Sequence, residues 1–185
     1  MMELSVKDRN LIKSLREEGV LQDVREHLLD QRNGTILVTC SDGDQFVEVF
    51  HHQEKLQAGQ RSRPRIHTFG WHGGVLACAP HSPVNKREHD HLVFLDQIGD
   101  GRTMKNINTV VACAHAPCGA AHKNGLGIEK VITLQFRAKQ RIETLNRGIT
   151  VACFFDVDYG NGRKRTYFLS RPEWRTWARK NSVAV

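Results

Sequence analysis

Two short apolar runs rich in β-branched residues constrain the fold of this chain more than any other feature. Residues 35–40 read Thr-Ile-Leu-Val-Thr-Cys, and residues 108–114 read Asn-Thr-Val-Val-Ala-Cys-Ala. Continuous apolarity over so few residues is typical of strands that are buried on both faces, as in a parallel sheet. Both runs therefore predict central strands of an α/β protein.

The N-terminal part of the chain carries helical signals. Ser5 followed by Asp8 is typical of a capping box, in which the two side chains satisfy backbone N–H groups at the start of a helix. Apolar residues then recur at helical spacing on both sides of Gly19: Leu11, Ile12, Leu15, Leu21, Val24, Leu28 and Leu29. Residues 1–34 therefore predict an N-terminal helical arm, built from two helices or from one kinked helix.

Towards the other end of the chain, the pattern changes from helical to strand-like. Residues 128–145 carry a helical apolar stripe, although residues 131–136 fit a strand equally well. Residues 149–157 and 166–169 flank a Gly-Asn-Gly turn and predict a β-hairpin. We expect a single α/β domain over residues 35–185, with a mostly parallel central sheet flanked by helices and a C-terminal β-hairpin.

Composition excludes several classes of protein. Hydrophobic residues make up 39% of the chain and charged residues 25%, as in soluble globular proteins rather than disordered ones. No stretch approaches the ~18 consecutive apolar residues of a membrane-spanning helix. Residues 1–20 carry charge throughout, unlike a secretory signal. We therefore expect a cytoplasmic protein with no membrane association.

The net charge of +7 does not identify a partner. The 27 Lys and Arg residues are spread along the chain, and their densest group, at residues 163–165, directly follows a glycine turn. Such a position is typical of a solvated hairpin strand. A nucleic-acid partner is therefore not expected, and a basic nucleic-acid-binding module is the weakest of the functional alternatives.

The five cysteines and ten histidines indicate thiol or metal chemistry, because an odd number of cysteines in a cytosolic chain argues against a disulfide framework. The first apolar run ends in Cys40, and the second leads into His115 and Cys118. If the two strands are neighbours, these three side chains can meet at one zinc ion. Three protein ligands leave one position for a water, whose pKa zinc lowers towards ~7.

Each of these residues also has a simpler interpretation. Cysteine is among the most buried residue types, so a single cysteine is more often part of a core than a metal ligand. A single histidine such as His115 is more often structural. Cys113 is a rival ligand, but it lies within the apolar run and we assign it to the core, together with Cys78 and Cys153.

The two ends of these runs resemble the metal motifs of β-class carbonic anhydrases. Residues 40–44, Cys-Ser-Asp-Gly-Asp, resemble the Cys-x-Asp-x-Arg motif of that family, and residues 115–119 resemble its His-x-x-Cys-Gly segment. The resemblance implies a β-carbonic-anhydrase-like fold over residues 35–185 and a Zn²⁺ ion held by three ligands. These ligands would be Cys40, His115 and Cys118.

The same resemblance implies an activity and an assembly. A zinc-bound hydroxide, oriented by Asp42 as the catalytic residue, would hydrate carbon dioxide to bicarbonate, or hydrolyse a related small molecule such as carbonyl sulfide or carbon disulfide. The chain would act as a zinc lyase on a small-molecule substrate. It would form a homodimer or a higher homo-oligomer. The helical segment at residues 5–30 is the candidate contact, and the alternative is that this segment packs on its own domain.

One position departs from the family pattern. The arginine of the Cys-x-Asp-x-Arg motif pairs with the aspartate and keeps it off the metal, whereas this chain has Asp44 at that position. Asp42 could then become a fourth ligand, which would give a non-catalytic zinc-binding protein with a structural or sensing role. Alternatively, another cation could replace the missing arginine, and the candidates are Arg61, Arg63 and Arg65.

Overall fold

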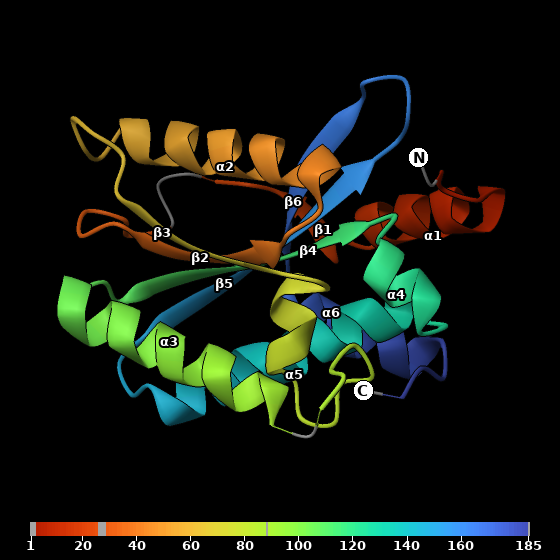
Figure 1. Ribbon diagram of the computed structural model, residues 1–185. Helices are drawn as coiled ribbons and strands as arrows, with labels where there is room; N and C mark the ends of the chain where they lie inside the picture. Colours follow the sequence, from red (N-terminus) through yellow and green to blue (C-terminus); the bar gives the residue numbers. More distant parts are fainter. Residues whose placement is uncertain (1–2, 26–28, 88, 185) are drawn as a thin grey trace.

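The part of the chain that the structure describes, residues 3–25, 29–87 and 89–184 of a computed structural model, contains a six-stranded sheet (Figure 1). The strands are β1 (Leu21–Asp23), β2 (Thr35–Cys40), β3 (Ile66–Trp71), β4 (Thr109–Ala116), β5 (Thr150–Asp158) and β6 (Lys164–Leu169). Their order across the sheet is β1-β6-β5-β4-β2-β3. The four strands from β2 to β5 are parallel, whereas β6 and β1 run antiparallel to their neighbours. The predicted α/β domain with a mostly parallel sheet is confirmed.

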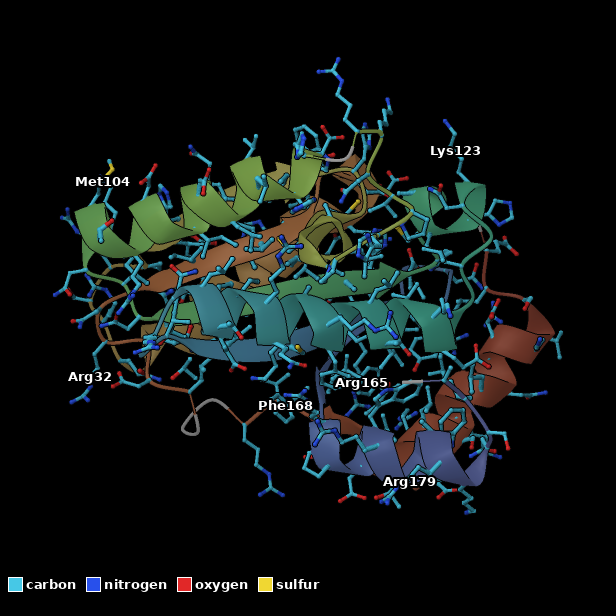
Figure 2. The ribbon with its side chains drawn as sticks, turned by 90° about the horizontal axis from the view of Figure 1, so that it is seen from below. Arg32, Met104, Lys123, Arg165, Phe168 and Arg179 are labelled. Carbon is cyan, nitrogen blue, oxygen red and sulfur yellow. The ribbon has the colours of Figure 1, made fainter. Side chains whose placement is uncertain are left out.

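Helices cover both faces of this sheet. Helix α2 (Gly43–Ala58) lies on one face, and α3 (Asp90–Lys105) and α5 (Ile128–Leu145) lie on the other, as Figures 1 and 2 show. Helix α6 (Arg171–Lys180) lies beside α1 (Val6–Glu17), where Lys180 pairs with Glu18. No helix among the described residues is long and apolar enough to cross a membrane.

The two predicted central strands are neighbours in this sheet. Strands β2 and β4 pair in parallel, with Val38 opposite Ala112. Every residue of both strands is buried, because the helical layers cover both of their faces. Continuous apolarity therefore reflects a position at the centre of an α/β sandwich, as the sequence predicted.

The N-terminal segment is only partly helical. Helix α1 begins with the predicted capping box, in which the Ser5 side chain accepts from the Asp8 N–H and the Asp8 side chain accepts from the Ser5 N–H. The expectation of a second helical stretch is wrong at Leu21, which lies in β1 and pairs with Leu169 of β6. The free edge of β6 offers backbone hydrogen bonds that outweigh the helical spacing of so short a segment. Leu28, which belonged to that expectation, lies outside the described residues.

The C-terminal half resolves the remaining ambiguity. Residues 131–136 lie inside α5, so the helical alternative is the correct one. Strands β5 and β6 form the predicted hairpin. Its turn contains Gly160 and Gly162, both with positive φ angles that glycine adopts most readily. At the carboxyl ends of the parallel strands, two short elements complete the fold: helix α4 (Gly119–Lys123) follows β4, and the 3₁₀ helix η2 (Gly74–Cys78) follows β3.

Candidate metal centre

Three side chains with metal-binding atoms meet where β2 and β4 end. Cys40 is the last residue of β2, His115 lies next to the last residue of β4, and Cys118 directly precedes α4. Their ligand atoms all lie within 4.8 Å of one another, and all three residues are buried. The carboxyl ends of neighbouring parallel strands meet at one edge of a sheet, and this topology brings together residues 75 or more positions apart. The structure thus unites the three residues that the sequence singled out.

The environment of His115 fits a metal ion. Apart from the Cys40 thiol beside it, its buried imidazole has no hydrogen-bond partner among the described residues at either ring nitrogen. Leaving a buried polar group unpaired costs about 1–3 kcal/mol, and a cation bound to one nitrogen removes part of that cost. Two sulfurs and one imidazole nitrogen are the donor set that zinc prefers. The residues present therefore fit Zn²⁺.

The two thiols are arranged so that one is readily deprotonated. The pKa of Cys40 is lowered to about 3, first because the Cys118 thiol donates a hydrogen bond to its sulfur and then because the His115 imidazole lies beside it. The same contact with Cys40 raises the pKa of Cys118. The thiolate is the form of cysteine that binds metals, so the pair is prepared for a cation.

A glycine pair supports the Cys40 sulfur. The backbone N–H of Gly73 donates to Cys40 Sγ at 3.4 Å. Gly73 and Gly74 both have positive φ angles, and a Cβ added to Gly74 would lie 2.6 Å from the backbone nitrogen of Cys40. Only glycine allows so close an approach. The sequence showed the two consecutive glycines between the metal motifs but did not reveal this contact.

Asp42 lies just outside the cluster and caps the next helix. Its Oδ1 accepts the backbone N–H of Asp44 at 3.0 Å, which makes Asp42 the N-cap of α2. The positive end of the helix dipole stabilises a carboxylate in this position. Among the described residues, the group of mutually close ligand atoms contains Cys40, His115 and Cys118 but not Asp42. Its carboxylate is therefore engaged with the helix rather than seated among the three ligand atoms.

The arginines that were candidates to replace the motif arginine lie at the wrong end of the sheet. Arg65 precedes β3, and its carbonyl accepts the N–H of Thr35 at the start of β2. Its guanidinium donates to the carbonyl of Asn33, and Arg61 likewise donates to the Arg32 carbonyl. Cys40 is at the opposite end of β2, so the suggestion that Arg61, Arg63 or Arg65 replaces the arginine is wrong.

A lysine from the C-terminal hairpin lies near the start of α2 instead. The ammonium of Lys164, in β6, donates to the backbone carbonyl of Asp44 and lies 3.0 Å from a carboxylate oxygen of Glu48. It also lies 3.9 Å from a carboxylate oxygen of Asp158. The sequence analysis placed Lys164 on a solvated strand, because no nearby residue indicates a contact with a helix 120 positions earlier. Lys164 is thus the cation that ties β6 to the first turn of α2.

The other three cysteines belong to the core, as predicted. Cys113, the rival ligand, donates from Sγ to an Asp156 carboxylate oxygen at 3.0 Å. Burial raises the pKa of both Cys78 and Cys153 to about 12. These thiols therefore stay protonated at neutral pH and contribute no metal ligand.

A small cavity adjoins the cluster on the side of α4. It has a volume of about 280 Å³, and its walls include His115 and Cys118. Leu126 and Phe155 supply apolar surface, and the imidazole of His122 supplies a polar group. The metal cluster therefore borders a space suited to a small molecule.

Comparison with known proteins finds similarity only among solved structures. No family model and no curated protein matches the chain. It is similar to the β-carbonic anhydrase CafA of Aspergillus fumigatus, at 19% identity over 97% of this chain and 96% of that one, with a TM-score of 0.42. It is also similar to the carbonic anhydrase of Streptococcus mutans, at 14% identity over 89% of this chain and 99% of that one, with a TM-score of 0.45. A third similar structure is a β-carbonic anhydrase of Trichomonas vaginalis, at 13% identity over 91% of this chain and 99% of that one, with a TM-score of 0.42.

Proposed function

We propose that this chain is a zinc-dependent lyase that hydrates carbon dioxide to bicarbonate. The observation that carries the proposal is the buried cluster of Cys40, His115 and Cys118, whose imidazole has no other partner among the described residues. The resemblance of residues 40–44 and 115–119 to the metal motifs of β-class carbonic anhydrases supports the same activity. When bound, zinc lowers the pKa of a coordinated water towards ~7 and so supplies a nucleophile at neutral pH.

Each residue of the site has a role in this proposal. Cys40, His115 and Cys118 would hold the metal, and three protein ligands would leave a position for water. Gly73 fixes the Cys40 sulfur through its N–H. Asp42, held at the N-terminus of α2, would accept a hydrogen bond from the attacking water and so orient its lone pair.

The cavity beside the cluster suits the proposed substrate. Carbon dioxide is small and uncharged, and Leu126 and Phe155 give the cavity apolar walls. Among the described residues, its lining contains no lysine or arginine, whereas Glu3 and Asp8 contribute carboxylates. Carbonyl sulfide and carbon disulfide share this shape and remain candidate substrates.

Metal content and hydration rate together test the proposal. We expect one zinc per chain by atomic absorption, and carbon dioxide hydration by stopped flow that rises from about pH 6.5 to about pH 9 as the nucleophile forms. Cys118→Ala should lose the zinc and the activity, whereas Cys153→Ala, a matched change of a buried core cysteine, should retain the metal.

Two results would contradict the proposal in different ways. Stoichiometric zinc without activity at any pH, towards all three candidate substrates, would favour the non-catalytic alternative in which Asp42 closes the site. A chain without stoichiometric zinc would contradict both functions.

A further inference from the structure

A second cleft, unrelated to the metal cluster, lies between the segment that follows η2 and helix α5. Its volume is about 590 Å³, which is within the ~300–1,000 Å³ of small-molecule sites. It shares no lining residue with the cavity beside the cluster. We call it the basic cleft, and its main lining residues are His81, Ser82, Asn85, Lys86, Arg87 and Arg141.

The charge of the basic cleft is one-sided. Lys86, Arg87 and Arg141 all line it, and no carboxylate lines it among the described residues; Glu88 lies outside them. Within the described part of the chain, none of these three side chains forms an ion pair, whereas Lys164 and Lys180 each pair with a glutamate. Three like charges around one cleft repel each other, and a bound anion would offset that repulsion.

The loop that carries two of these cations is held in place by hydrogen bonds. One carboxylate oxygen of Asp90, at the start of α3, accepts the backbone N–H groups of Lys86 and Arg87 at 3.0 Å each. The side-chain amide of Asn85 donates to the carbonyl of Ala77 at 3.0 Å. The carboxylate of Asp90 is thus occupied by backbone groups of this loop, and the loop backbone is ordered before a ligand binds. Such ordering reduces the entropy lost on binding.

The basic cleft also contains polar atoms without partners. Ser82 is buried, and its hydroxyl oxygen has no hydrogen-bond partner among the described residues. The same holds for Oδ1 of Asn85. Unpaired buried polar atoms are costly, so a ligand that both accepts and donates hydrogen bonds would stabilise this region.

We infer that the basic cleft binds a phosphate group, either as inorganic phosphate or as the phosphomonoester of a small molecule. A phosphomonoester carries about −1.5 to −2 charges at pH 7 and three acceptor oxygens, which matches three cations lining one cleft better than a single carboxylate does. Guanidinium groups bind phosphate oxygens in pairs, and lysine binds them as a point charge. The inference does not depend on the metal centre or on the proposed lyase activity.

Calorimetric titration at constant ionic strength tests this inference. The probes are inorganic phosphate and adenosine monophosphate, titrated separately into the intact, metal-loaded chain. We expect saturable binding of at least one probe, and the tighter of the two identifies the source of the phosphate group. Arg141→Gln should weaken that binding about tenfold or more, because it removes a charge-assisted hydrogen bond. Arg147→Gln, an exposed arginine just beyond α5 and outside the cleft, should change it less than about twofold.

A second variant keeps the test decisive if Arg141→Gln is poorly folded by circular dichroism. Lys86 is exposed, so Lys86→Gln removes a cation of the cleft with little structural risk, and it should weaken binding several-fold. Three outcomes would overturn the inference: no saturable binding of either probe, equal weakening by Arg147→Gln, or binding that neither cleft variant changes. The last result would place the phosphate elsewhere, for example at the metal.

Discussion

Asp44 is the residue whose identity bears most directly on the proposed activity. It is exposed in the first turn of α2, where its negative charge interacts favourably with the helix dipole. Its backbone N–H donates a hydrogen bond to Oδ1 of Asp42, the N-cap of the helix. A family arginine at this position would pair with Asp42, and no arginine reaches it from residues 61–65. We therefore expect the side chain at position 44 to decide whether Asp42 stays away from the metal position or occupies it.

We expect Asp44→Arg to raise the carbon dioxide hydration rate several-fold. The new guanidinium can pair with the Asp42 carboxylate and hold it away from the metal. A cation in the first turn opposes the helix dipole and costs about 0.3–1 kcal/mol, so zinc content and thermal stability are measured in parallel. Asp44→Gln is the matched control, because it removes the same charge without supplying a partner. Equal rates for the two variants would contradict the role of the missing arginine.

At the scale of elements, the 3₁₀ helix η2 shapes the metal centre through the glycines at its start. Gly74 adopts a φ of +54°, and its backbone packs against Thr39 and Cys40 at the end of β2. This packing carries the Gly73 N–H to the Cys40 sulfur. The position of η2 after β3, next to the end of β2, therefore supports the Cys40 side chain.

Gly74→Ala should weaken zinc binding by about tenfold or more and lower the free energy of unfolding by about 1–3 kcal/mol. The added Cβ would lie 2.6 Å from the Cys40 nitrogen and would push η2 away from β2. Chelator competition measures the zinc affinity, and urea titration measures the stability. Gly119→Ala, where an added Cβ meets nothing within 4 Å, should leave both unchanged. Wild-type zinc affinity in Gly74→Ala would show that this contact is dispensable.

A second contact between elements, between β6 and α2, also affects the site. Lys164 joins the hairpin to α2, the helix that Asp42 caps, through the carbonyl of Asp44 and the carboxylate of Glu48. Because Asp42 is the N-cap, a shift of this turn moves the carboxylate relative to the metal cluster. We infer that Lys164 is a positioning residue for Asp42.

Lys164→Gln should lower kcat for hydration by roughly tenfold with unchanged zinc content, since it loosens the first turn of α2 without touching a ligand. Lys164→Arg should restore most of the rate, because it restores the ion pairs, and this rescue distinguishes positioning from a general loss of stability. Arg163→Gln, an exposed cation one residue earlier, is the control and should have the wild-type rate. A Lys164→Gln enzyme with normal kcat would contradict the positioning role.

Sequence reasoning succeeded where the signal was local. Continuous apolarity identified β2 and β4, and the thiol and imidazole side chains at or just beyond their carboxyl ends singled out Cys40, His115 and Cys118. It failed where a distant partner decided the outcome. Leu21 has helical spacing with its neighbours, yet it pairs with β6, and Lys164 has strand-like surroundings, yet it contacts α2. Neither contact leaves a pattern in the residues nearby.

At the scale of the whole molecule, two buried thiols make folding stability depend on alkaline pH. Burial raises the pKa of Cys78 and Cys153 from 9.0 to about 12. Below about pH 9 both thiols are protonated in the folded and the unfolded chain, so their stabilising effect is fully present. Above that pH the unfolded chain releases protons that the folded chain keeps, so stability falls as the pH rises towards about 12.

The expected loss is about 1.4 kcal/mol per thiol at pH 10, relative to pH 8. Urea unfolding at the two pH values measures it. Cys153→Ala should lower stability at both pH values through its small cavity, but the loss between pH 8 and pH 10 should shrink by about 1.4 kcal/mol. An unchanged difference between the two pH values would show that Cys153 does not titrate in the unfolded chain as expected.

The pairing of β2 with β4 has a kinetic consequence. Cys40 and His115 are 75 positions apart in sequence, so in the unfolded chain these two side chains are far apart and do not form a metal site together. Pairing strands so far apart in sequence is slow, and Cys40 meets His115 only after β2 has paired with β4. If zinc binds as proposed, the complete site of three ligands would therefore form late in folding, after β2 has paired with β4.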